Sequence, residues 1–310
     1  MSKSSGNIIS PEEILKKYGA DILRLWVASS DYAEDLRIDH SILEQHAESY
    51  RKIRNTFRFI LGNLKDNFSP KDFKKTKHQD FPELEKLILH KLFVLNSEIK
   101  NNLKNYNFHK LQKDLLNFCA LDLSSFYFDI RKDILYCDDL NSNKRKSCVT
   151  LLNIVLECLI KWYAPVLSFT TEEISQLAQK NKKTSIHEEN FPEIPDNWKN
   201  DALFKRWEKL LQVRQQVNIA IEEKRSSKII GSSLEADVEI ALPKSEFDIL
   251  KEIDAKELFI ISNVTQNILK DKKNEISVTV KKAKGTKCSR CWKIVEKVKE
   301  GKCSRCSSIK

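Results

Sequence analysis

Four cysteines near the C-terminus form two C-x-x-C pairs, Cys288 with Cys291 and Cys303 with Cys306. Such a pair presents two thiolates to one ion, and two facing pairs complete a tetrahedral site of the kind that binds zinc. The surrounding segment is too small to bury a core, so the metal would have to supply its folding free energy, about 10–16 kcal/mol in sites of this type. The sequence therefore predicts one Zn²⁺ per chain.

The same spacing also permits two disulfides, which are typical of secreted proteins. The N-terminal residues MSKSSGN are polar, however, and lack the apolar stretch of a signal peptide. The sequence contains no run of about twenty apolar residues, so no transmembrane helix is expected. We therefore expect a cytoplasmic protein with reduced thiols, no membrane partner and a monomeric state. Among the remaining cysteines, Cys119 and Cys158 lie in apolar stretches and are expected in the core.

The composition is basic, with 54 Lys and Arg against 44 Asp and Glu and a net charge of +10. Lysine-rich surfaces attract polyanions such as nucleic acid. The phosphate-binding glycine motifs and the G-x-S-x-G and H-E-x-x-H signatures are all absent from the sequence. The common nucleotide-binding and hydrolase classes therefore receive no support.

Two groups of residues have the chemistry to contact RNA. Arg51, Arg54 and Arg58 follow a helical spacing and share one face, which is either a solvated surface or a row of phosphate contacts. Trp292 comes directly after the first cysteine pair and lies close in sequence to basic residues. It could stack on an unpaired base or fill the small core of the metal-binding segment. Arg290 and Arg305, inside the two pairs, are further candidates.

The apolar periodicity predicts a mainly α-helical protein, in which an antiparallel helical bundle is followed by a small α/β segment and a four-cysteine zinc finger. A helix begins at Ser10 with a capping box and ends near Gly19. Thr170 or Thr171 is expected to cap a short helix. Further helices are predicted over 42–66, 83–104, 108–130, 143–163 and 201–224, and strands over 236–243, 256–264 and 274–283.

Several segments, in the same order along the chain, resemble one enzyme family. MSKSSGN at 1–7 resembles part of the K-M-S-K-S-x-G-N signature of class I aminoacyl-tRNA synthetases. The segment at 19–38 resembles the stretch directly C-terminal to this signature in the isoleucine, valine and leucine enzymes. Residues 50–64 and 122–138 resemble the helical anticodon-binding domain of the isoleucyl enzyme, and residues 213–240 continue the similarity. The closing CSRCW and CSRC motifs are similar to the C-terminal zinc finger of bacterial isoleucyl-tRNA synthetases.

This resemblance implies an isoleucine–tRNA ligase, which joins L-isoleucine to tRNA(Ile) with conversion of ATP to AMP and diphosphate. By motif position, Lys3 is the lysine that the family uses on ATP, and Ser2 and Ser4 belong to the same ATP-binding loop; Mg²⁺ accompanies ATP. The resemblance further implies that the helical bundle and the zinc finger bind the anticodon region. Arg51, Arg54 and Arg58 would contact the backbone, and Arg290, Trp292 and Arg305 the loop.

The family's Rossmann core with its H-I-G-H motif and its editing domain have no counterpart in this sequence. We therefore expect a C-terminal fragment that is inactive alone. The expected regions are the end of the catalytic domain (1–45), the anticodon-binding domain (46–198), an α/β junction (199–284) and the zinc finger (285–310). Two alternatives are a free-standing zinc-containing RNA-binding module and a DNA-repair glycosylase, which shares a similar finger. The glycosylases need an N-terminal proline nucleophile, whereas the second residue here is Ser2.

Overall fold

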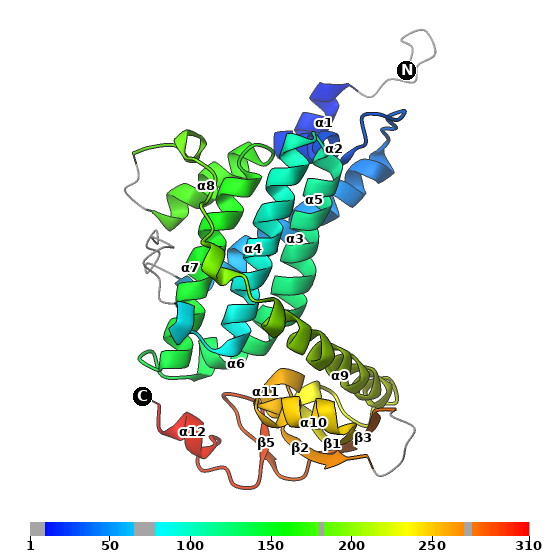
Figure 1. Ribbon diagram of the computed structural model, residues 1–310, viewed down its shortest axis with the longest axis vertical. Helices are drawn as coiled ribbons and strands as arrows, with labels where there is room; N and C mark the ends of the chain where they lie inside the picture. Colours follow the sequence, from blue (N-terminus) through cyan, green and yellow to red (C-terminus); the bar gives the residue numbers. More distant parts are fainter. Residues whose placement is uncertain (1–9, 65–77, 180–182, 270–274, 310) are drawn as a thin grey trace. The chain divides into compact units, whose positions relative to one another are not determined.

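A computed structural model describes residues 10–64, 78–179, 183–269 and 275–309 (Figure 1). The chain forms two compact units. The first comprises Met1–Phe128 and Lys146–Lys199, and the second comprises Asp129–Arg145 and Asn200–Lys310. The chain thus leaves the first unit at Phe128, returns to it at Lys146 and leaves it again at Lys199. Each unit is described by itself.

The first unit is helical, and in Figure 1 its helices α4, α5 and α7 run side by side. Its α-helices are α1 (Pro11–Tyr18), α2 (Ala20–Ser29), α3 (His40–Leu64), α4 (Glu83–Lys104), α5 (Phe108–Asn117), α7 (Asn143–Tyr163, whose first turn belongs to the second unit) and α8 (Ser168–Ala178). A π-helix, η3 (Phe118–Phe128), follows α5, and the 3₁₀ turns are η2 (His78–Asp80), η4 (Ile186–Glu188) and η5 (Asp196–Trp198). The predicted helical bundle is confirmed.

The helix boundaries follow from local sequence in most places. The Ser10 hydroxyl accepts a hydrogen bond from the backbone N–H of Glu13 at 3.3 Å, which confirms the predicted N-cap of α1. Gly19 ends α1 with a φ of 84°, a left-handed value that favours glycine. The predicted bounds of α4 and α7 coincide with the observed ones, because both helices combine strong periodicity with clear breaks on either side.

The helix predicted over 108–130 has a more complex form than expected. Its central section is the π-helical η3, and the helical run continues beyond residue 130 as α6 (Asp129–Cys137), which belongs to the second unit. In the π section the hydroxyls of Ser124 and Ser125 donate to carbonyls five residues earlier, at 2.8 and 2.6 Å. Apolar residues occur on nearly every turn of this segment, so the apolar periodicity could not distinguish a π-helix from an α-helix.

The prediction that Thr170 or Thr171 caps a helix is wrong. Helix α8 begins at Ser168, and both threonines lie buried inside it. Its N-terminus is instead satisfied by Asp21 of α2, whose carboxylate accepts from the backbone N–H groups of Phe169 and Thr170 at 3.3 and 2.7 Å. A carboxylate at this position also complements the helix dipole. The cap is supplied across 149 residues of sequence, which local patterns do not encode.

The second unit combines helices with a three-stranded sheet. Its elements are α6, α9 (Asp201–Ser226), η6 (Ser233–Glu235), β1 (Ala236–Leu242), α10 (Lys244–Lys251), α11 (Ala255–Phe259), β2 (Asn263–Ile268), β3 (Ser277–Lys282), β4 (Thr286–Lys287), β5 (Ile294–Val295) and α12 (Ser304–Ser307). The sheet order is β2-β1-β3; β1 pairs with β2 in parallel and with β3 in antiparallel orientation. The predicted α/β segment is confirmed.

The strand predicted over 256–264 is only partly correct. Residues 255–259 form the short helix α11, which Asp254 caps by accepting from the N–H of Glu257 at 3.1 Å. The chain then turns at Ile260, in a left-handed conformation, and enters β2. The apolar run LFII satisfies a helix and a strand equally well, so the capping aspartate decides between them.

Candidate metal centre

The four cysteines that the sequence singles out meet at one point in the second unit. The sulfurs of Cys288, Cys291, Cys303 and Cys306 all lie within 4.8 Å of one another, and all four residues are buried. They are free thiols, not disulfides. The geometry therefore allows the four side chains to hold a metal ion, as the spacing predicted.

Two short turns place the four sulfurs. Strand β4 leads into the first pair, and the turn closes where the N–H of Cys288 donates to the carbonyl of Lys293 at 3.0 Å. In the second pair, Cys303 caps α12 and Cys306 lies within it. The backbone N–H and the hydroxyl of Ser289 both donate to the carbonyl of Gly301 at 2.8 Å, so the first turn is tied directly to the segment that precedes the second pair.

One glycine is required for this packing. Gly285 has a φ of 131°, and a Cβ atom there would lie 2.4 Å from the carbonyl oxygen of Val295 on β5. Only glycine lets the two strands of the hairpin approach this closely. The hairpin holds the first cysteine pair, so this contact helps to fix its position.

The electrostatics of the thiols differ from one another. Burial acts to raise the pKa of Cys288, but hydrogen bonds from the backbone N–H groups of Cys291, Cys303 and Arg290 lower it to about 6. Burial raises the pKa of Cys291 and of Cys306. Hydrogen bonds from the backbone therefore favour the thiolate form of Cys288, whereas the raised pKa values of Cys291 and Cys306 mean that a bound cation would have to displace their protons.

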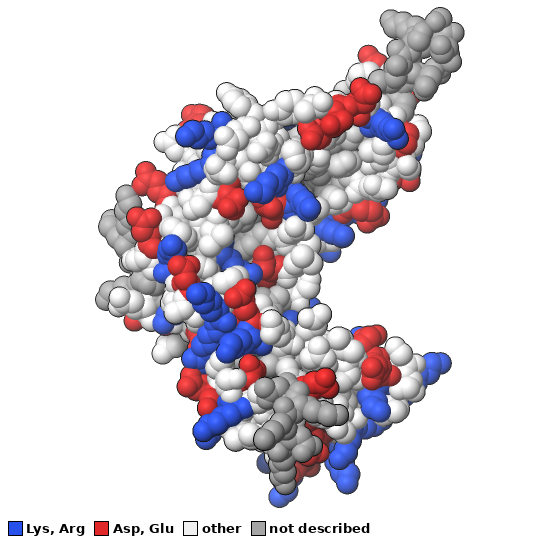
Figure 2. Space-filling view, turned by 45° about the vertical axis from the view of Figure 1, so that its right-hand side comes forward, with Lys and Arg blue, Asp and Glu red and all other residues white. Residues whose placement is uncertain are grey.

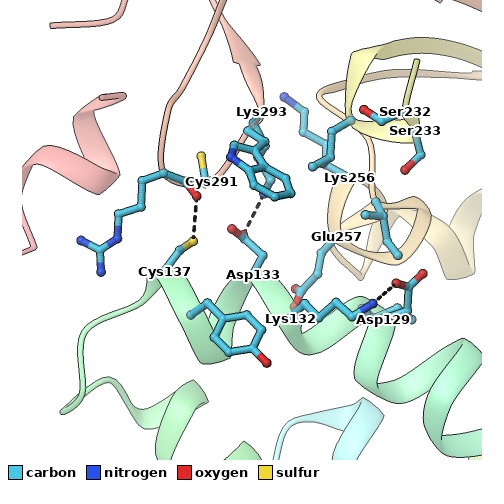
Figure 3. Close-up of a pocket in the computed structure, with 16 residues that line it drawn as sticks. Asp129, Lys132, Asp133, Cys137, Ser232, Ser233, Lys256, Glu257, Cys291 and Lys293 are labelled. Carbon is cyan, nitrogen blue, oxygen red and sulfur yellow. Dashed lines mark hydrogen bonds and ion pairs between the residues drawn. The ribbon is translucent and has the colours of Figure 1, made fainter. Parts of the chain in front are cut away.

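Helix α6 anchors the metal-binding segment. The Arg305 guanidinium binds the Asp133 carboxylate through two hydrogen bonds of 2.7 and 2.6 Å and also reaches Asp138 at 3.3 Å. The Lys293 ammonium lies 3.2 Å from Asp133 (Figure 3). The Cys137 thiol donates to the Arg290 carbonyl at 3.6 Å. The α6 face thus contacts residues from both cysteine pairs.

A second ion-pair group fixes α6 against the α/β segment. Glu257 of α11 is bound by Arg131 and Lys144, and the Arg131 side chain is only 3% exposed. Arg214 of α9 donates to the Leu258 carbonyl at 2.9 Å. A buried guanidinium such as that of Arg131 is tolerated only when its charge is paired, here with the carboxylate of Glu257. Sequence reasoning missed these residues and Asp133, because charged residues on a helix ordinarily indicate solvent exposure.

The other candidate residues for RNA binding lie in different surroundings. Arg51, Arg54 and Arg58 are all exposed on α3 in the first unit. Arg51 pairs with Glu48, and Arg54 lies 3.1 Å from Glu173. Among the described residues, Arg58 has no carboxylate partner. Trp292 is 60% exposed with Lys287 over its ring at 5.7 Å, so it is not the filled core of the metal-binding segment.

The charge is distributed over the surface and not concentrated in one patch on the face drawn in Figure 2. There, Lys and Arg side chains alternate with Asp and Glu. Ser2, Lys3 and Ser4 lie outside the described residues. No helix among the described residues combines the length and apolar character needed to cross a membrane.

Comparison with known proteins assigns two parts of the chain to families. Residues 85–240 match the family described as the anticodon-binding domain of tRNA ligase, and residues 1–39 match tRNA synthetases class I (I, L, M and V). The first match covers half of the chain.

Curated relatives match nearly the whole chain. The isoleucine–tRNA ligase of Pelagibacter ubique is 57% identical over 294 residues, which are 95% of this chain and 32% of that protein. The same-named proteins of Agrobacterium fabrum and Kosmotoga olearia are 40% and 42% identical, each over 94% of this chain and 31% and 32% of their own lengths. The chain thus spans about a third of the length of these relatives.

A solved structure shares the fold. It is a chain of the ternary complex of Agrobacterium radiobacter K84 LeuRS with tRNA and LeuAMS, 15% identical with a TM-score of 0.50, and the match covers 78% of this chain and 24% of that chain. At this identity the likeness concerns the arrangement of elements alone. That arrangement agrees with the one described above, in which a helical bundle is followed by further elements.

Proposed function

This chain belongs to the family of anticodon-binding domains of tRNA ligases, and from that membership we propose that it is the tRNA-binding part of an isoleucine–tRNA ligase. The observation that carries the proposal is the 57% identity to an isoleucine–tRNA ligase over 95% of the chain. The proposed reaction joins L-isoleucine to tRNA(Ile) with ATP converted to AMP and diphosphate. A free-standing RNA-binding module is disfavoured, because residues 1–39 match class I synthetases.

We propose Zn²⁺ as the metal. Four buried cysteine sulfurs form a soft donor set with no oxygen ligand among them, and such a set selects zinc over calcium, magnesium or manganese. Magnesium in the complete reaction would accompany ATP. The zinc would be structural, since all four positions of a tetrahedral site are filled by protein and none is left for a substrate.

The proposed RNA contacts divide by role. Arg58 and Arg290 have no ion-pair partner among the described residues, so they are available for phosphate. Arg51 and Arg54 would exchange their exposed carboxylate partners for phosphates, and this costs little free energy because exposed ion pairs are weak. Trp292 would stack on an unpaired base, and its exposed ring supports this proposal. Arg305 is held by two aspartates, and we propose that it serves tRNA binding by positioning the metal-binding segment.

The roles of the residues expected to bind ATP are proposed from sequence resemblance. Lys3, with Ser2 and Ser4 beside it, would place an ammonium group on the triphosphate as charge develops on the leaving diphosphate. We also propose a cytoplasmic monomer, in line with reduced cysteines and a polar surface.

Binding of an unmodified tRNA(Ile) transcript tests the function. We expect the chain to bind this transcript more tightly than an otherwise identical one whose anticodon is replaced. The logarithm of the association constant should fall linearly with the logarithm of the salt concentration, because phosphate contacts release counterions. Equal affinity for both transcripts, together with a slope near zero, would contradict the proposal.

A further inference from the structure

Helix α2 is fastened to the segment around the start of α8 by two polar side chains. The Arg24 guanidinium donates to the carbonyls of Pro165 and Val166, at 2.7 and 2.8 Å. One turn earlier, the Asp21 carboxylate accepts from the hydroxyl of Thr170 at 2.6 Å, in addition to the two backbone N–H groups that it caps. Asp21 and Thr170 are only 7% and 3% exposed. The negative charge of Asp21 is therefore fixed in position and only weakly screened by salt.

Hydrogen bonds continue from Thr170 to the surface of α3. The hydroxyl oxygens of Thr170 and Tyr50 lie 2.8 Å apart, and Arg54 Nη1 donates to the Tyr50 oxygen at 3.0 Å. Tyr50 is half-buried, whereas the Arg54 side chain is 48% exposed. A buried carboxylate is thus connected to an exposed guanidinium through two hydroxyl groups. We call these four residues, which all belong to the first compact unit, the Asp21–Arg54 network.

The direction of every hydrogen bond in the Asp21–Arg54 network is fixed by its two ends. An ionised carboxylate only accepts, and a guanidinium only donates. The single hydroxyl proton of Thr170 is given to Asp21, so the Tyr50 hydroxyl must donate to Thr170. The Tyr50 oxygen then accepts from Arg54. All the bonds point from the positive group to the negative group, and hydrogen bonds aligned in this way strengthen one another.

The arrangement allows Arg54 to exchange one partner while it keeps the other. Its Nη1 is held by Tyr50, whereas its Nη2 lies 3.1 Å from the Glu173 carboxylate, which is itself 50% exposed. An ion pair this exposed is weak, so a phosphate can replace Glu173 without breaking the hydrogen bond to Tyr50. A long side chain that is oriented before binding also loses less conformational entropy when it binds.

We propose that the Arg54 guanidinium is oriented for a phosphate of the tRNA backbone by three positioning residues: Tyr50, Thr170 and Asp21. The inference rests on the proposed function and deepens it, because it assigns a role to three residues that act through Arg54 and not by contact with RNA. Asp21 lies on α2, within the part of the chain that matches class I synthetases. The network therefore connects that part directly with a candidate RNA contact on α3.

The test compares variants that each remove one hydroxyl group. Tyr50→Phe and Thr170→Val interrupt the network, but they leave Arg54 itself and the backbone hydrogen bonds of Asp21 in place. Thr171→Val is the matched control, because Thr171 is the next residue of α8, is fully buried and donates its hydroxyl to a backbone carbonyl four residues earlier. Thr170→Ser keeps the hydroxyl and serves as the rescue variant.

Affinity for an unmodified tRNA(Ile) transcript is measured by fluorescence anisotropy, with each variant made alone and combined with Arg54→Ala. Thermal unfolding is recorded for every protein. We expect Tyr50→Phe and Thr170→Val each to lower affinity about two- to tenfold, the range for ordering one long side chain on binding. Neither change should lower affinity further once Arg54 is replaced, because both act through that residue. Thr170→Ser and Thr171→Val should bind as the wild type does.

Glu173→Gln gives a result of the opposite sign, since it removes the carboxylate that competes with phosphate for Arg54. It should bind tRNA at least as tightly as the wild type.

Two results would overturn the inference while the proposed function stands. One is unchanged tRNA affinity in both Tyr50→Phe and Thr170→Val, and the other is a loss that persists undiminished in the Arg54→Ala background. A loss in Thr171→Val as large as that in Thr170→Val would show an effect of helix packing and would refute the inference equally. If the wild type does not bind tRNA(Ile) at all, the proposed function fails as well.

Discussion

The guanidinium of Arg305 binds the carboxylate of Asp133 in a two-pronged arrangement, with Nη1–Oδ2 and Nη2–Oδ1 distances of 2.7 and 2.6 Å. Arg305 immediately precedes Cys306, and Lys293, the second cation on Asp133, follows Cys291 by two residues. One aspartate on α6 therefore holds segments of both cysteine pairs. Two parallel hydrogen bonds between a planar guanidinium and a carboxylate fix the relative orientation of the two groups as well as their distance. Helix α6 therefore helps to position the cysteine cluster.

The Arg305–Asp133 contact should contribute measurably to stability. Arg305→Ala and Asp133→Asn are each expected to lower the free energy of unfolding by about 1.5–3 kcal/mol, the range for hydrogen bonds to charged groups. The double variant should lose less than the sum, because both changes remove one interaction. Urea titration of the four proteins measures the coupling.

Lys132→Ala provides the matched control for this cycle. Lys132 pairs with Asp129 on the same helix, but both side chains are well exposed. Exposed pairs of this kind contribute about 0–1 kcal/mol. A control loss as large as that of Arg305→Ala, or strictly additive losses in the cycle, would contradict the anchoring role of Asp133.

Stability should depend on pH through Asp133. Burial acts to raise the pKa of this carboxyl, but the hydrogen bond from Arg305 and the charges of Lys293 and Arg305 hold its pKa below the usual value. The unfolded chain therefore binds this proton more readily, and the stabilisation is present above an unfolded pKa of about 3.9 and is lost as the pH falls through the lower, folded pKa.

The measurement compares wild type with Asp133→Asn between pH 6 and pH 2.5. The difference in unfolding free energy between the two proteins should shrink as the pH falls below about 4. Taking a difference removes acid effects that do not depend on Asp133. A difference that is constant over this range would show that the pKa of Asp133 is not lowered by folding.

Metal content should depend on four of the eight cysteines. We expect one zinc per chain by elemental analysis, and Cys303→Ser should lower this value strongly, because a hydroxyl is a poor substitute for a thiolate ligand. Cys137→Ala is the informative control: its thiol is buried beside the cluster but donates to a backbone carbonyl. Zinc loss in Cys137→Ala comparable to that in Cys303→Ser would refute the four-ligand assignment.

The arginines of α3 can be tested through the salt dependence of tRNA binding. Arg58→Ala should weaken binding and reduce the log–log slope by about one unit, because one phosphate contact accounts for about 0.9 in that slope. Glu48→Gln, on the same exposed helix, frees Arg51 from its partner without removing a cation. It should leave the slope unchanged or steeper. An unchanged slope in Arg58→Ala would exclude this residue from phosphate contact.

The sequence allowed the helical bundle, the strands β1 and β3 and the four-cysteine cluster to be predicted, because each depends on local spacing. Periodicity placed α4 and α7 correctly, and the C-x-x-C spacing identified the cluster. The same reasoning could not find Asp21 as the cap of α8, because its partner residues lie about 150 positions away.

The inclusion of residues 129–145 in the second unit was equally invisible to local patterns. Helix α6 continues the helical run of η3, and nothing in its composition marks a change of unit. From the sequence, its acidic residues Asp133 and Asp138 are indistinguishable from ordinary solvent-exposed charges. In the structure, both form ion pairs with Arg305. Likewise, Ile260 and Trp292 carry no sequence signal of their left-handed backbone, since that conformation is set by the turns around them.

Measuring tRNA binding before and after zinc removal tests most directly whether the metal holds an RNA-binding surface in place. The chain is titrated with tRNA(Ile) as purified, after treatment with a strong chelator, and after zinc is restored. We predict one zinc per chain at the start, a loss of tRNA affinity of at least about tenfold on removal, and recovery with zinc; tenfold corresponds to about 1.4 kcal/mol. Full affinity in a chain verified as metal-free would contradict the account.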